Sequence, residues 1–188
     1  MSRLDQLEES YRRHVAIPLV PGRPLAQRIW FLVYAPEDER RLQNRLTEFE
    51  IATTDAGLHW REIDLDGSYA AWIDAAYGDD EDERRSVLFD REMAEDYANP
   101  GFRDFLVEKI RATIAAVPED EVDSTVFAVH GLMELYDFIH VSEVMEEMGR
   151  EIRGVLLLFF PGARQGNSYR FLEARDGWDY LATPITAD

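Results

Sequence analysis

The stretch VLLLFF at residues 155–160 is the most apolar segment of this chain, and it decides the fold. Its apolar residues follow one another without alternation, which is typical of a strand that is covered on both faces. The stretches IWFLVY at residues 29–34 and TVFAVH at residues 125–130 have the same character. Buried strands of this kind belong to parallel sheets with helices on both sides. The sequence therefore predicts an α/β protein.

Helical patterns lie between these strands. Apolar residues recur at helical spacing in residues 4–15 and again in residues 42–53. A further strand is expected at residues 59–65, followed by a helix that Ser68 is expected to cap. Asn99 and Pro100 form a typical helix entry, a cap followed by a first-turn proline. Helical regions are also expected at residues 84–97 and 132–148.

The predicted architecture has three layers. A mostly parallel sheet of about four core strands lies between helices. Residues 169–173 and 178–181 are expected to add a short antiparallel C-terminal extension at the sheet edge. We expect residues 1–188 to form a single domain, because two halves of this length would each have a poor core.

The composition excludes several classes of site and location. The chain has no cysteine, so disulfides, thiolate zinc sites and cysteine nucleophiles are ruled out. The first residues lack the apolar stretch of a signal peptide, and the longest apolar run falls far below the roughly 20 residues of a membrane span. We therefore expect a cytoplasmic protein. Hydrophobic residues make up 46% of the chain, enough for a core despite a net charge of -18.

Acidic residues are concentrated in two segments. Residues 79–96 contain nine acids and three arginines, and residues 119–151 contain ten acids and one arginine. Such a surface repels phosphate backbones, so we expect no nonspecific binding of nucleic acid. Two interpretations stay open for these acids, a solvated face that keeps the protein soluble and a docking face for a basic partner.

The motifs of common catalytic and cofactor sites are missing. No Gly-x-x-x-x-Gly-Lys-Ser/Thr loop occurs, and Lys109 is the only lysine of the chain. The glycine fingerprint of dinucleotide sites, the Gly-x-Ser-x-Gly elbow and His-Glu-x-x-His are absent as well. We expect no catalytic residue and no cofactor.

His130 is the most informative of the four histidines. Together with Gly131 it follows a predicted parallel strand, at the carboxyl end where ligand sites of open α/β sheets gather. These two residues are candidates for a strand-end pocket. His140 and Glu143 could share a helix face with a metal ion, but a zinc site needs more convergent ligands than these two. We therefore expect no metal, and structural roles for His130 and His140 are the alternative.

The segment PGARQGNSYR at residues 161–170 leaves the most apolar strand through two glycines. Glycines allow close approach of the backbone, so exposed N–H groups beside arginines could hold an anion or contact a partner. A strand-to-strand turn in which the glycines serve geometry alone is the alternative. The candidate contact residues are Gly162, Arg164, Gly166, Asn167, Ser168 and Arg170.

Residues 155–170, with their Leu-Phe-Phe-Pro-Gly run, a spaced glycine, Ser168 and Arg170, resemble the C-terminal hallmark of the BrxB family. Residues 30–65 are similar to the opening unit of that family, an apolar strand, a Pro-Glu-Asp-Glu helix start and the strand REIDL. Residues 126–148 resemble its strand–glycine–helix unit. The chain departs from the family pattern at His140 and Ser142, where members carry an arginine and a histidine.

BrxB proteins are small accessory components of bacterial BREX phage-defence systems. The resemblance implies a non-enzymatic adaptor that binds a PglZ-like protein of the alkaline-phosphatase superfamily, a BrxC-like ATPase, or both. These systems also include a DNA methyltransferase. The family supplies no catalytic residues to carry over, and self-association is compatible with such a role.

Two other functions stay open. One is a degenerate nucleotide-binding or metal-dependent hydrolase domain of P-loop-like topology that uses His130, Asp137 and Glu143. The other is an acidic DNA mimic that regulates a partner nuclease or methyltransferase by occupying its basic groove.

Overall fold

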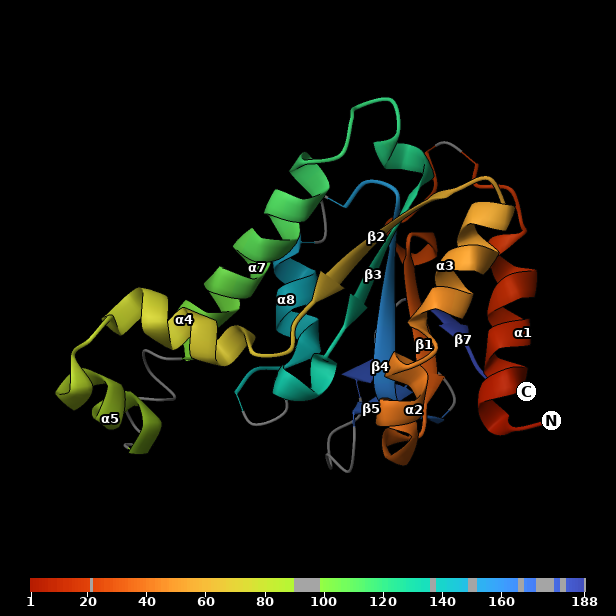
Figure 1. Ribbon diagram of the computed structural model, residues 1–188. Coiled ribbons are helices and arrows are strands. Elements are labelled where there is room, and N and C mark those ends of the chain that lie inside the picture. Colours follow the sequence, from red (N-terminus) through yellow and green to blue (C-terminus); the bar gives the residue numbers. More distant parts are fainter. Residues whose placement is uncertain are drawn as a thin grey trace.

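A computed structural model describes most of the chain. The described residues are 1–20, 22–89, 99–135, 138–148, 152–165, 168–171, 178–179 and 182–187. In this structure the protein is an α/β sandwich in which helices cover both faces of a mostly parallel sheet (Figure 1). The predicted fold class is confirmed.

The parallel part of the sheet has five strands in the order β2-β3-β4-β1-β7. Their bounds are β1 (Ile29–Tyr34), β2 (His59–Asp64), β3 (Thr125–His130), β4 (Val155–Gln165) and β7 (Thr183–Ile185). β4 lies in the middle of this order between β3 and β1. The most apolar segment of the sequence therefore forms the centre of the sheet.

One face of the sheet packs against helices from the first third of the chain. These are α1 (Arg3–Val15), α2 (Glu39–Gln43) and α3 (Leu46–Asp55). Alternate strand residues such as Leu32, Leu157 and Phe159 point to this face and are fully buried. The four apolar residues predicted for the inner side of the first helix are buried here too: Leu4, Leu7, Tyr11 and Val15.

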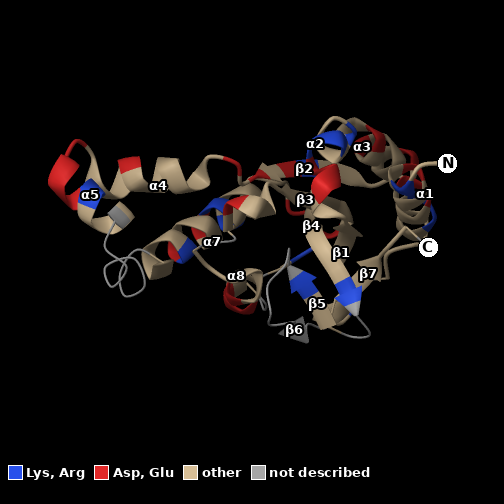
Figure 2. Cartoon of the chain, turned by 90° about the horizontal axis from the view of Figure 1, so that it is seen from below, with Lys and Arg blue, Asp and Glu red and all other residues tan. Residues whose placement is uncertain are grey.

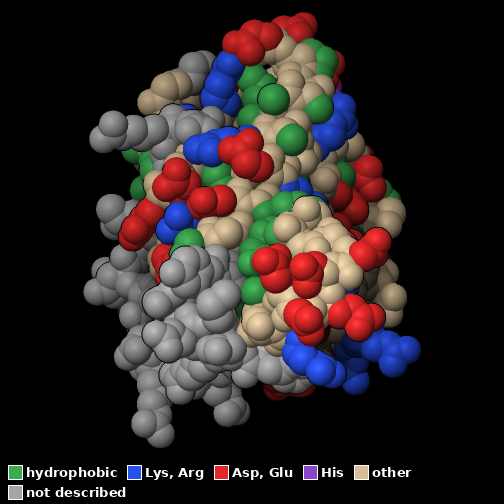
Figure 3. All heavy atoms as spheres, turned by 90° about the vertical axis from the view of Figure 1, so that its left-hand side faces the viewer, with side chains coloured by type: hydrophobic (Ala, Val, Ile, Leu, Met, Phe, Trp, Pro, Cys, Tyr) green, Lys and Arg blue, Asp and Glu red, His purple; other side chains and the backbone are tan. Residues whose placement is uncertain are grey.

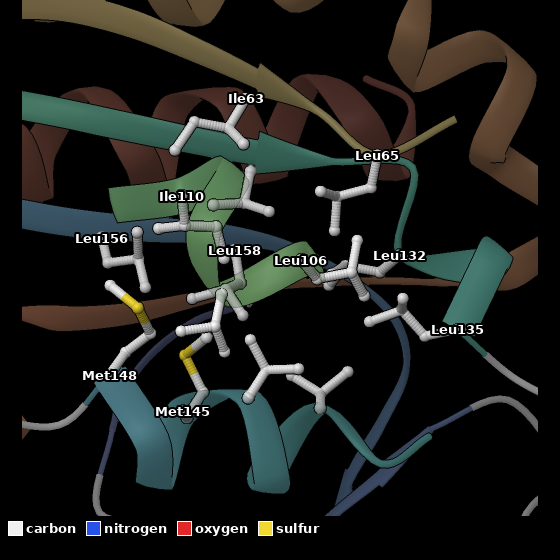
Figure 4. Close-up of a cluster of buried hydrophobic side chains, with 14 of the residues drawn as sticks. Ile63, Leu65, Leu106, Ile110, Leu132, Leu135, Met145, Met148, Leu156 and Leu158 are labelled. Atoms are coloured by element: carbon white, nitrogen blue, oxygen red, sulfur yellow. The ribbon is translucent and has the colours of Figure 1, made fainter. Parts of the chain in front are cut away.

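The opposite face packs against α4 (Ser68–Tyr77), α7 (Asn99–Ala115) and α8 (Val141–Met148). Figure 4 shows how α7 brings Leu106 and Ile110, and α8 brings Met145 and Met148, toward the sheet residues Leu156 and Leu158. The apolar residues of odd number in β1 and β3 also belong to this cluster. Since each strand sends alternate side chains to the two faces, every residue of β1 and β3 is buried.

The C-terminal part of β4 extends beyond the parallel ladder and turns back as a hairpin. It pairs antiparallel with β5 (Ser168–Phe171), which pairs with β6 (Trp178–Asp179). The predicted antiparallel extension is thus present, while residues 172–173 and 180–181 lie outside the described part. β7 was not predicted from the sequence, because it is only three residues long and contains Pro184. A proline is tolerated there since β7 is an edge strand.

Two helices that were predicted to be continuous are interrupted in the structure. The region expected to be helical at residues 132–148 contains a 3-10 turn (Leu132–Leu135) and then α8, with non-helical residues 138–140 before it. Phe138 leaves the helical path and stacks on the Tyr69 ring, with the centroids 3.8 Å apart. The helix expected around residues 42–53 is interrupted at Asn44 and Arg45, between α2 and α3.

Ser68 does not cap α4 as expected. The N-cap position is Gly67, in a left-handed conformation, and the Tyr69 N–H in the first turn donates to the distant Glu134 carboxylate at 3.2 Å. The Ser68 hydroxyl instead accepts a hydrogen bond of 2.9 Å from the Lys109 ammonium on α7. A contact between α4 and α7 has therefore taken the place of the local cap.

α5 (Glu81–Phe89) lies at the end of α4 that is farthest from the sheet (Figure 1). Figure 3 views the molecule from this side, where acidic and basic side chains are both spread over the described surface. The helix expected at residues 84–97 begins earlier, at Glu81, and residues 90–98 lie outside the described part. Among the described helices, none has the length and apolar character needed to cross a membrane.

α1 is fixed to the fold at both ends. At its start, the Ser2 hydroxyl accepts from the Asp5 N–H, and the Asp5 carboxylate accepts from the Ser2 N–H in return. Arg45 donates to Asp5 at 2.8 Å and to Glu8 at 2.7 Å, which joins α1 to the break between α2 and α3. These contacts explain why the helix break at Arg45 is favourable.

The buried end of α1 is held by a hydroxyl pair. The Tyr11 and Thr53 hydroxyl oxygens are 2.6 Å apart, and Thr53 also donates to the Phe49 carbonyl. We expect Tyr11→Phe to lower the free energy of unfolding by about 1–2 kcal/mol, because it removes one buried hydrogen bond. In a double-mutant cycle measured by urea unfolding, Thr53→Val should cost much less in the Tyr11→Phe background. Additive losses would contradict this coupling.

The interactions of Asp5 make a prediction about acid stability. Hydrogen bonds from Ser2 and Arg45 lower the pKa of Asp5 from 3.8 to about 2. A carboxyl group whose pKa is lowered by folding stabilises the protein above its unfolded pKa and loses that effect as the pH falls through the folded pKa. Between pH 4 and pH 2, the melting temperature of Asp5→Asn should therefore fall less than that of the parent. Asp55→Asn, which removes an exposed acid 4.0 Å from Arg12, is the control for the loss of one negative charge.

Candidate functional site

The carboxyl ends of the parallel strands carry a connected group of polar side chains. Tyr34, the last residue of β1, donates its hydroxyl hydrogen to Glu39 on α2. Gln43, one turn later on α2, donates to Glu39 at 3.0 Å and to Asp66 at 3.1 Å. Burial, followed by the charges of Glu39 and Asp66, raises the pKa of Tyr34 far above its ordinary value. The Tyr34 hydroxyl is therefore a fixed donor that stays protonated.

His130, the last residue of β3, lies on the same face of the sheet. It is only 6% exposed, yet neither ring nitrogen has a hydrogen-bond partner. Its Nδ1 is 3.4 Å from an Asp64 oxygen and its Nε2 is 3.7 Å from a Glu62 oxygen. Both acids belong to the adjacent strand β2, where the register pairs Asp64 with His130. The imidazole thus lies between two carboxylates that are themselves partly exposed.

A tight turn after β2 places Asp66 beside the end of β3. The Leu65 N–H donates to the His130 carbonyl and the Asp66 N–H donates to the Asp64 carboxylate. Gly131 has a φ of 75°, and a Cβ there would lie 2.7 Å from both the nitrogen and a carboxylate oxygen of Asp66. The position following His130 therefore requires glycine. We call Glu39, Glu62, Asp64, Asp66 and His130 the carboxyl-edge cluster.

The hairpin residues predicted as an anion or partner contact do not form one site. Arg164 pairs with Tyr169 and Ala163 pairs with Arg170. Directly opposed residues share a face and successive residues alternate, so Arg164 and Arg170 lie on opposite faces of the hairpin. Gly166 and Asn167 lie outside the described residues. An anion site built from both arginines is not supported by this register.

Gly162 and Ser168 serve the geometry of the hairpin. Gly162 lies opposite Phe171, and Ser168 is opposite Gln165 at the first described pair beyond the turn. A Cβ at position 162 would come within 2.1 Å of the Arg170 carbonyl oxygen and 2.9 Å of the Phe160 ring. The close approach of the two strands therefore requires glycine here, as the alternative interpretation of this segment supposed.

Opposite charges are separated along this end of the molecule. Figure 2 shows the sheet from its carboxyl end, with acidic residues over β2 and beside α2, and basic residues on α2 itself and over the hairpin of β4 and β5. Among the described residues, no lysine or arginine forms an ion pair with a carboxylate of the carboxyl-edge cluster. The cluster therefore carries uncompensated negative charge.

The constellation expected for a hydrolase is not assembled. His130 points to the face covered by α1–α3, whereas Glu143 belongs to α8 on the opposite face. Asp137 lies outside the described residues. Within the described ranges, no group of three histidines or acids is arranged to hold a metal ion. His140 is exposed and its carbonyl accepts from the Glu143 N–H at the start of α8, and Ser142 lies in the first turn of this helix.

A cavity of about 470 Å³ lies at the opposite, amino edge of the sheet. Two guanidiniums and two carboxylates line it: Arg23, Arg28, Asp120 and Asp123. Burial and the neighbouring Arg28 charge lower the pKa of Arg23, while Asp123 acts in the other direction. Because charges of both signs meet there, this cavity has no clear preference for a cation or an anion.

Sequence reasoning found His130 and Gly131 but missed most of their neighbours. Glu62 and Asp64 alternate at the end of the predicted strand and Asp66 follows it, so they could have been placed at the carboxyl edge with His130. Glu39 was noted only as an acid near a helix start. Gln43 carried no signal, because its role depends on how α2 lies over the sheet.

Comparison with family models, with curated proteins and with solved structures finds no match for this chain. The site is therefore described by its own geometry alone.

The turn after His130 makes a prediction about stability. Gly131→Ala should lower the free energy of unfolding by about 1–2 kcal/mol for the left-handed backbone and by a further 1–3 kcal/mol, roughly, for the clash with Asp66. Gly57→Ala is the matched control, because Gly57 has a φ of 78° and no heavy atom within 4 Å of its Cβ position. Urea unfolding measures both variants. Equal losses would contradict a close approach at Gly131.

Proposed function

We propose that this chain is a non-enzymatic accessory subunit of a BREX-type antiphage defence complex in the cytoplasm. In this role it binds a PglZ-like protein, a BrxC-like ATPase, or both. The resemblance of residues 30–65, 126–148 and 155–170 to the BrxB family supports the identity of the partners. The carboxyl end of the sheet supports the mode of action.

The observation that carries the proposal is the separation of charge at this end of the sheet. Glu62 and Asp64 have side chains that are 44% and 58% exposed, and no arginine or lysine of the described residues neutralises them. Arg164 and Arg170 extend from the adjacent hairpin on its two faces. Complementary charges on a partner would fix orientation and speed association. A surface with both signs of charge fits a protein partner better than a uniformly charged polymer.

An enzymatic role finds less support. Function in α/β folds depends on the site and not on the topology. The side chains that converge at the carboxyl edge are acceptors around one imidazole, and Glu143, the acid proposed as its catalytic companion, is on the other face of the sheet. A hydrolase using His130 and Glu143 together would need a different arrangement.

Affinity purification from the native host tests the proposal. The tagged parent should recover the PglZ-like or the BrxC-like protein, identified by mass spectrometry. Glu62→Lys combined with Asp64→Lys should reduce this recovery about tenfold or more, because like charges would then face the partner.

Asp82→Lys combined with Glu83→Lys is the matched control. These two exposed acids on α5 give the same change in net charge away from the carboxyl edge. The control should recover the partner as the parent does. Failure of the parent to recover either defence protein would contradict the adaptor role, and equal losses in the two variants would contradict docking at this edge.

A further inference from the structure

His130 is buried without satisfying its hydrogen-bonding groups. The residue is only 6% exposed, and neither ring nitrogen has a hydrogen-bond partner. Buried polar groups in folded proteins are almost always hydrogen-bonded, and exceptions call for an explanation such as a missing ligand. The separations of 3.4 Å to Asp64 and 3.7 Å to Glu62 are longer than ordinary hydrogen bonds, so neither carboxylate satisfies the ring.

The groups around His130 are nearly all acceptors. Ionised carboxylates accept hydrogen bonds and cannot donate, and a neutral imidazole offers one lone pair beside its single N–H. The Trp60 indole N–H donates to Glu62 at 3.2 Å, and Gln43 and the Asp66 N–H donate to Asp66 and Asp64. No lysine or arginine of the described residues forms an ion pair with these three acids. A ligand for this place must therefore bring donors and positive charge.

The available cations differ in how well they fit. The described residues hold no group of three ligands suited to a metal ion. An ammonium is a compact charge with three donors, whereas a guanidinium is planar, carries five N–H donors and can bridge two carboxylates. Carboxylates on either side of an imidazole match a planar donor better than a point charge. Charge complementarity thus favours an arginine side chain.

We propose that the carboxyl-edge cluster accepts an arginine side chain of a docked partner protein, which donates to the exposed carboxylates of Asp64 and Glu62 beside the ring of His130. The proposal rests on the adaptor function for the source of the arginine. Buried and hydrogen-bonded charge pairs of this type are frequent anchor points of interfaces, where arginine is enriched. The site would then be one anchor of the partner, with the exposed Asp66 at its rim.

The test uses the full chain with ¹⁵N-labelled histidine and the peptide acetyl-Gly-Arg-Gly-amide as the probe. Titration followed by NMR should move the ring signals of His130, assigned with His130→Gln, in a saturable way. The same peptide with citrulline has nearly the same shape without the charge, and it should bind at least tenfold more weakly. Equal effects of the two peptides would overturn the proposal.

Two variants localise the effect. Asp64→Asn should weaken binding of the arginine peptide about tenfold, which corresponds to about 1.4 kcal/mol. Asp82→Asn on α5 has the same loss of charge and should bind as the parent does. If both variants weaken binding equally, the effect is one of net charge and the site is not the carboxyl-edge cluster. A response of the His130 signals to Mg²⁺ but not to the arginine peptide would also overturn the proposal.

The outcomes separate this proposal from the adaptor function. If Asp64→Asn binds the arginine peptide poorly but still recovers the defence partner in full, the adaptor function stands and the arginine contact is wrong. If the arginine peptide binds at His130 as expected and no defence protein is recovered, the adaptor function is wrong and the preference of the site for a guanidinium stands.

Discussion

Burial of the central strand β4 on both of its faces is the constraint on which the rest of the structure depends. Leu156, Leu158 and Phe160 face α7 and α8, while Leu157 and Phe159 face α1 and α3, and all five are fully buried. A strand that is apolar on both sides can be stable only between two layers of helices. The two hydrophobic clusters, one on each face of the sheet, follow from this requirement.

The same constraint determines where function can lie. Both faces of the sheet are filled by packing, so polar side chains with freedom to bind are left at the ends of the strands. At the carboxyl edge, β2 and β3 end side by side and bring Asp64 and His130 together through their register. The turn at Gly131 then places Asp66 beside them. This neighbourhood is a product of strand pairing.

The sequence predicted those elements that depend on local pattern. The buried strands at residues 29–34 and 125–130 and the inner stripe of α1 agree with the structure. α7 begins at Asn99, but the side-chain oxygen of Asn99 has no hydrogen-bond partner and does not cap the helix as predicted. Predictions failed where a distant residue decides the outcome. The Ser68 hydroxyl accepts a hydrogen bond from Lys109 instead of capping α4, and Phe138 leaves the helical path to stack on Tyr69. Gln43 shows the same limit in the site, because only the path of α2 brings it to Asp66. β7 is too short to leave a pattern at all.

The hydrogen bond between Lys109 and Ser68 has a consequence for chemical modification of this protein. Lys109 is the only lysine in the sequence, and its ammonium is partly buried where it holds α7 to α4. Acetylation or ubiquitination of an internal amine can therefore occur at one position alone, and either would remove a charge that contributes to a helix contact. Arginine supplies every other permanent cationic side chain, so amine-directed reagents leave nearly all of the positive surface unaltered.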